Sequence, residues 1–204
     1  MTKVTLSNTE MNLVLNKEIF LTKTEVINKV YLLFEQLQIF YKQNVQSNSA
    51  IPEFIVNTNA KISKGENYNQ LPWAILDYPN YFKGKDVFAV RTFFWWGNFM
   101  SINFLVMGRY SKPIIESLIN NISVYKDWYL CINENAWQHD FTADNFMKIE
   151  KLNSAQITKS TFIKMAKKIP LEEWDNIQLG VEKYFIEINT LISFSNFQDD
   201  EKAL

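Results

Sequence analysis

The chain has 204 residues and a formal net charge of −1, with 47% hydrophobic and 15% aromatic residues. This size and apolar content suit one globular domain over residues 1–204, with a core that needs neither disulfides nor metal ions. The near-zero charge excludes a strong electrostatic pull toward nucleic acid or acidic membranes, and the single cysteine excludes a framework of internal disulfides.

The N-terminal segment, residues 1–21, lacks the continuous apolar run of a signal peptide, so a cytoplasmic location is expected. Its pattern is compatible with either a strand or a short helix. A helix is predicted over residues 23–45, because Thr22 and Glu25 have capping-box spacing and apolar residues follow at helical intervals.

A long β-hairpin is predicted over residues 86–110, DVFAVRTFFWWGNFMSINFLVMGRY, with Gly97-Asn98 as a two-residue turn. In that register Trp96 lies opposite Phe99. Both faces of the arms are mostly apolar, so the arms are expected to be central strands that are covered on both sides. The uncharged run within them is too short and too rich in strand-forming residues for a membrane helix, and no membrane partner is expected.

Other elements follow from caps, prolines and apolar spacing. Strands are predicted near residues 71–79 and 127–133, and further helices over residues 112–122, 159–168 and 171–193. The segment 142–157 has no clear pattern, and about the last ten residues are expected to fray. The fold class predicted is α+β: an antiparallel sheet of about five or six strands centred on the hairpin, with the helices packed on it.

Arg91 breaks the apolar pattern of its strand, because it lies on the same face as Phe93 and Trp95. Arginine stays charged and is rarely buried without a partner. A structural ion pair, with Asp77 as the partner, is the favoured interpretation. The alternative is that Arg91 faces a pocket that takes an anion.

The leading functional hypothesis is that the domain binds a small anionic or aromatic ligand beside the hairpin. The residues assigned to this site are Arg91, Asp77, Trp73, Tyr78, Trp95 and Asn103. The arginine supplies the charge, the aspartate orients it, and the three aromatic rings form stacking walls. Asn103 is placed opposite Thr92 by the two-residue turn. It either bonds polar neighbours inside the core or lines the floor of a cavity.

Two other functions stay open. One is a non-catalytic interaction protein, of an inhibitor or immunity type, with aromatic anchors. The other is a hydrolase without a familiar motif, which would use Asp77, Asp140 or His139. The five glycines form neither GxGxxG nor a P-loop, and one histidine with one cysteine cannot build the usual zinc sites. No cofactor and no metal are therefore expected.

The lysines between residues 148 and 168 are the only candidate basic track for nucleic acid. Three of them, Lys164, Lys167 and Lys168, share one face of the helix predicted there. Because the whole chain is nearly neutral, we interpret this cluster as a solvated lysine face, and no nucleic acid partner is expected. Cys131 lies in the middle of a predicted strand and is interpreted as a small buried hydrophobe.

Overall fold

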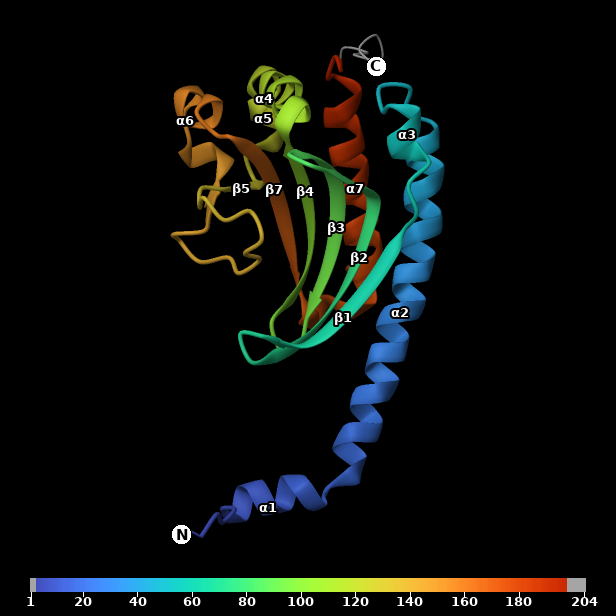
Figure 1. Cartoon of the computed structure of the whole chain (residues 1–204), viewed down its shortest axis with the longest axis vertical. Coiled ribbons are helices and arrows are strands. Elements are labelled where there is room, and N and C mark those ends of the chain that lie inside the picture. Colours follow the sequence, from blue (N-terminus) through green and yellow to red (C-terminus); the bar gives the residue numbers. More distant parts are fainter. Residues whose placement is uncertain (1–2, 198–204) are drawn as a thin grey trace.

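The computed structural model describes residues 3–197. Seven strands form one antiparallel sheet in the order β1-β2-β3-β4-β7-β5-β6 (Figure 1). The strands are β1 (Lys61–Tyr68), β2 (Leu71–Lys83), β3 (Asp86–Trp95), β4 (Phe99–Met107), β5 (Tyr129–Cys131), β6 (Phe146–Lys148) and β7 (Phe162–Pro170). The α+β class is confirmed, with one or two more strands than predicted. The predicted fraying falls largely on residues 198–204, outside the described residues.

Helices cover one face of this sheet and flank its ends. They are α1 (Asn8–Leu15), α2 (Lys17–Gln46), α3 (Glu53–Val56), α4 (Ser111–Asn120), α5 (Ile122–Tyr125), α6 (Ser154–Thr158) and α7 (Ile177–Ser193). The predicted helices at 23–45 and 112–122 are present as α2 and α4. The capping box predicted at Thr22 and Glu25 is wrong, because α2 already begins at Lys17, with Asn16 as its N-cap. The one at 171–193 opens as a 3₁₀ segment, Leu171–Asn176, before α7. No helix within residues 3–197 combines the length and apolarity needed to cross a membrane.

The main core lies between the sheet and the layer formed by α2, α4 and α7 (Figure 1). Tyr41 of α2 stacks on Phe185 of α7, with ring centroids 3.9 Å apart and planes 12° apart. The Tyr41 hydroxyl lies 2.7 Å from Oγ1 of Thr92 in β3, so this buried pair satisfies both polar groups. Thr92 therefore faces the helices.

The hairpin at the centre of the sheet is present, but its predicted register is wrong by one residue. Trp95 pairs with Phe99, and a turn closed by Asn98 N–H donating to the Trp95 carbonyl leaves three residues in the loop. Gly97 has a φ of 69°, which glycine adopts without steric cost.

Because side chains alternate along a strand, this one-residue shift moves every β4 side chain to the opposite face. The helix layer then receives the large apolar residues Met100, Ile102, Phe104 and Val106. The other face receives Ser101 and Asn103, and Asn103 lies opposite Arg91 instead of Thr92. Burial of the larger apolar set explains why this register is preferred.

The helix predicted over residues 159–168 is wrong. Most of that segment is strand β7, which pairs with β4 along its whole length, and the short helix α6 precedes it. The backbone hydrogen bonds that this segment forms with the central strand β4 stabilise a strand more than the helical spacing of its apolar residues favours a helix. The three lysines are therefore split: Lys164 and Lys168 lie on one face of β7, and Lys167 lies on the other.

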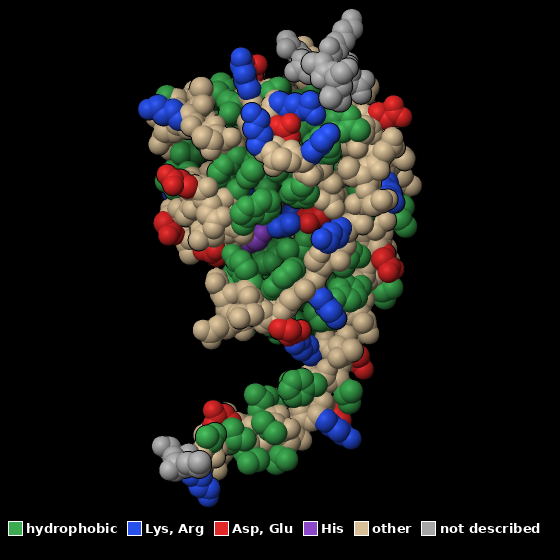
Figure 2. Space-filling model, viewed as in Figure 1, with side chains coloured by type: hydrophobic (Ala, Val, Ile, Leu, Met, Phe, Trp, Pro, Cys, Tyr) green, Lys and Arg blue, Asp and Glu red, His purple; other side chains and the backbone are tan. Residues whose placement is uncertain are grey.

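No helix within residues 3–197 forms a layer on the second face of the sheet. This face is covered in part by the loop of residues 132–145 between β5 and β6, and by the turn between β1 and β2 (Figure 1). In Figure 2 this face shows apolar side chains around a hollow in which the single histidine lies beside basic and acidic side chains. Arg91 lies on this face.

Candidate functional site

Arg91 and Asp77 are direct neighbours on β3 and β2. Nε of Arg91 donates to Oδ1 of Asp77 at 2.7 Å, and Nη2 donates to Oδ2 at 2.8 Å. This two-bond geometry is the strong form of an arginine–carboxylate contact. The ion pair expected from the sequence is therefore present, and it holds the guanidinium in one orientation.

His139 lies over Arg91 from the loop of residues 132–145. Its ring stacks on Phe93 with centroids 4.8 Å apart, and its Nε2 lies 3.2 Å from Nη1 of Arg91. Its backbone N–H donates to the Tyr68 hydroxyl at 2.7 Å, and that hydroxyl donates to Oδ1 of Asp140 at 2.9 Å. These bonds fasten the loop to the sheet and keep His139 buried.

Lys164 of β7 lies on the other side of His139 and is only 1% exposed. Its Nζ donates to the Ala136 carbonyl at 2.9 Å and to the Gln138 carbonyl, and it lies 3.5 Å from Nδ1 of His139. A lysine buried to this degree needs such partners. It ties the loop to the centre of the sheet.

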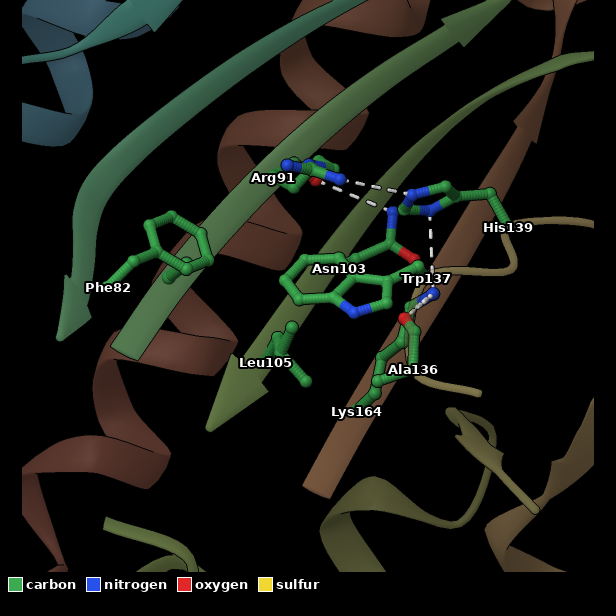
Figure 3. A pocket seen from close by; sticks show the side chains of 9 residues that line it. Phe82, Arg91, Asn103, Leu105, Ala136, Trp137, His139 and Lys164 are labelled. Atoms are coloured by element: carbon green, nitrogen blue, oxygen red, sulfur yellow. Dashed lines mark hydrogen bonds between the residues drawn. The ribbon is translucent and has the colours of Figure 1, made fainter. Parts of the chain in front are cut away.

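A hollow opens between these side chains, and we call it the Arg91 hollow (Figure 3). The hollow is partly open to solvent. Its polar lining residues are Arg91, Asn103, His139 and Lys164, and aromatic rings of Phe82 and Trp137 also line it. Trp137 is 48% exposed, and its ring centre lies 5.8 Å from the guanidinium carbon of Arg91. Trp137 thus forms the outer rim of the hollow.

Asn103 lines this hollow with an unpaired acceptor. Its Nδ2 donates to Oγ of Ser101 at 3.1 Å and to the Arg91 carbonyl at 3.5 Å. Its Oδ1 is buried and finds no hydrogen-bond donor among residues 3–197. In Figure 3 this oxygen points away from Arg91, toward the side of the hollow that Trp137 and Lys164 line.

The titration of the two buried bases reflects their surroundings. Burial lowers the pKa of His139 well below its ordinary value, and the positive charges of Lys164 and Arg91 lower it further. Burial also lowers the pKa of Lys164 to about 7. His139 is therefore neutral at physiological pH, and Lys164 gains or loses its proton close to physiological pH.

The structure brings together three of the six residues assigned to the site: Arg91, Asp77 and Asn103. Trp73 and Trp95 lie in a separate apolar cluster on the second face. Tyr78 lies in the main core on the helix side, where its hydroxyl donates to the Val56 carbonyl at 3.0 Å. None of these three rings lines the Arg91 hollow.

Sequence reasoning missed Lys164 and Trp137 as parts of the site. Lys164 was hidden by the helix predicted for its segment. As a strand, FIKMAKKIP places a lysine between the buried Ile163 and Met165, and this alternation is the signal that could have identified it. Trp137 lies two residues before His139 in an irregular loop, and no local pattern marks its position.

The other reactive groups in the part of the chain that the structure describes form no recognisable catalytic arrangement. Cys131 is buried, its pKa is raised mainly by burial, and its Sγ lies 3.5 Å from Oδ1 of Asn145. Asp140 accepts bonds from Tyr68 and Thr142. Among residues 3–197, no three His, Cys, Asp or Glu side chains are grouped so that they could hold a metal ion.

No protein-family model, no curated protein and no solved structure matches this chain. Function is therefore inferred from the site itself.

Proposed function

We propose that the protein binds a small anion in the Arg91 hollow, and that this anion also carries a hydrogen-bond donor. The proposal rests on one observation: Oδ1 of Asn103 is buried and has no hydrogen-bond donor among residues 3–197. Buried polar atoms in proteins almost always have a partner, and leaving one unpaired costs about 1–3 kcal/mol. This oxygen is buried in the wall of an open hollow. A donor on the ligand satisfies it.

Arg91 supplies the complementary contact for the negative charge. A guanidinium has five N–H groups, of which Asp77 takes two and His139 takes one. Two N–H groups are left for a ligand. Asp77 keeps the guanidinium fixed, so little conformational entropy is lost when an anion binds.

The aromatic rim suits the carbon atoms of such a ligand. The rings of Phe82 and Trp137 lie 6.1 Å apart and flank the opening. A small hydroxy acid fits this chemistry, because its carboxylate suits Arg91 and its hydroxyl suits Asn103.

Glycolate and propionate provide a matched test. They have the same number of non-hydrogen atoms, but only glycolate carries a hydroxyl. We expect glycolate to bind about tenfold more tightly, because propionate leaves Oδ1 of Asn103 unpaired. Five non-hydrogen atoms yield at most about 7.5 kcal/mol, a Kd of about 3 µM, so isothermal titration calorimetry should extend to millimolar ligand.

The variant Asn103→Leu should lose the preference for glycolate, because its side chain has a similar size but no polar atom. The control Asn120→Leu changes an exposed residue of α4 and should keep the preference. Equal binding of both acids by the wild-type protein would contradict the donor requirement. Absence of binding by either acid at millimolar concentration would overturn the proposed function.

A further inference from the structure

The side chains of Arg91, His139 and Lys164 form one continuous hydrogen-bonded chain along the Arg91 hollow (Figure 3). Arginine has donors only, so Nε2 of His139 must act as the acceptor in its contact with Nη1 of Arg91. A neutral imidazole then carries its single hydrogen on Nδ1. That hydrogen points at Nζ of Lys164.

The contacts of Lys164 show which protonation state completes this chain. Nζ already donates to the carbonyls of Ala136 and Gln138. An ammonium group has a third hydrogen, which would face the Nδ1–H of His139. A neutral amine has two hydrogens and one lone pair, so it donates to both carbonyls and accepts from His139. Every contact of the chain is satisfied only when Lys164 is uncharged.

Burial is the main cause that lowers the pKa of Lys164. From β5 Cys131 favours the ammonium form, and from β6 so does the ring of Phe146, whose centre lies 5.2 Å from Nζ. From β3 the charge of Arg91 disfavours the ammonium form, and from the loop the carboxylate of Asp140 favours it. No carboxylate among residues 3–197 forms an ion pair with Nζ.

We infer that the Arg91 hollow takes up one proton from solvent with each small carboxylate that it binds, and that Lys164 receives this proton. The inference rests on the proposed function and adds the form in which the ligand is bound. The negative charge of the carboxylate favours the ammonium form of Lys164, which lines the same hollow. The neutral amine of Lys164, the carboxylate of the ligand and one proton from solvent together give an ammonium and a carboxylate in the same hollow. No covalent bond to carbon forms or breaks.

Proton uptake is measured directly by titrating the protein with glycolate at pH 8 in amine buffers of different ionisation enthalpy, such as triethanolamine and Tris, which cannot compete as anions. The slope of the observed enthalpy against the ionisation enthalpy of the buffer is the number of protons taken up. We expect close to one proton at pH 8 and close to none at pH 5.5, where Lys164 is already charged. The affinity should fall about tenfold for each pH unit above about 7.

The variant Lys164→Arg assigns the proton to its residue. Arginine stays charged throughout this range, so the variant should bind glycolate with no proton uptake and no loss of affinity between pH 7 and pH 8. Lys168→Arg is the control, because this exposed lysine lies on the same face of β7. It should behave as the wild-type protein does.

The outcomes separate this inference from the proposed function. Binding of glycolate by the wild-type protein without proton uptake at pH 8 would overturn the inference and leave the proposed function standing. Uptake that persists in Lys164→Arg would overturn the assignment to Lys164. Absence of glycolate binding in every buffer would overturn both. The wild-type measurement decides the first question even if the variant fails to fold.

Discussion

At the scale of single residues, Arg91 forms the ion pair that its position in the sequence predicts, and it also lines a hollow. Its ion pair with Asp77 offsets the free energy lost when the charge leaves water. The two hydrogen bonds between the guanidinium and the carboxylate largely replace the lost hydration. The pair uses only one edge of the guanidinium. The ion pair and the hollow are therefore compatible, although the sequence presents them as alternatives.

His139 should make the stability of the protein depend on pH. The unfolded chain binds a proton on His139 at about pH 6.5, whereas burial and two neighbouring cations keep the folded state from binding it. Lowering the pH below 6.5 therefore favours unfolding. We expect the free energy of unfolding to fall by about 1 kcal/mol between pH 6.5 and pH 5.5. Guanidinium chloride denaturation at both pH values measures this change.

The comparison protein for this measurement is His139→Gln, which keeps a polar group near Arg91 and cannot titrate. Because the chain has one histidine, the difference in pH dependence between the two proteins belongs to this side chain. The variant should lose less stability than the wild-type protein over the same interval. Parallel curves would show that His139 accepts a proton as readily in the folded state as in the unfolded state.

At the scale of elements, the turn of the central hairpin determines which side chains reach the hollow. With three residues in the loop, Asn103 lies beside Arg91 on the second face of the sheet. With two residues in the loop, Asn103 would face the helices instead. Gly97, with its φ of 69°, thus allows the three-residue loop that places Asn103 beside Arg91.

Replacement of Gly97 by alanine should destabilise the protein by about 1 kcal/mol. A Cβ at this position would meet no atom within 4 Å, so the expected cost is that of a positive φ for a residue with a side chain. Urea denaturation measures the loss. Lys85→Ala, at an exposed position in the turn between β2 and β3, is the control and should change stability by less than about 0.5 kcal/mol. Equal stability of Gly97→Ala and the wild type would contradict this turn geometry.

At the scale of the whole molecule, the N-terminal region stands apart from the body. Figure 1 shows α1 and the first turns of α2 extending away from the sheet. No residue of α1 is buried, and the first buried residue of α2 is Val30. Apolar side chains such as Leu15 and Phe20 are more than half exposed. The core that supports the hollow is therefore built from residues beyond α1 and the first turns of α2.

Removal of residues 1–16 should leave the stability of the body unchanged. Residues 3–16 are all exposed, and hydrophobic stabilisation scales with the area that is buried. We expect the Tm to stay within about 2 °C of the full chain, since 1 kcal/mol corresponds to about 2–4 °C at this size. Thermal unfolding followed by circular dichroism measures it. A loss of 5 °C or more would show that the N-terminal segment contacts the body.

The sequence by itself determined the features that depend on local patterns. Apolar strand-forming residues on both sides of Gly97 are enough to predict the hairpin, and apolar residues at helical spacing predict α2 and α4. The need of a charge for a partner is enough to pair Arg91 with Asp77. These inferences hold because the deciding forces act between residues close in sequence or come from one residue's own chemistry.

Only the tertiary structure decided the rest. The segment 162–170 is a strand because β4 offers it a full ladder of hydrogen bonds, which its own sequence cannot reveal. His139, Trp137 and Lys164 meet Arg91 because a loop from one part of the chain folds over strands from two others. Burial and contacts between distant segments assign these side chains their neighbours, their pKa values and their place in the hollow, and no local pattern encodes such contacts.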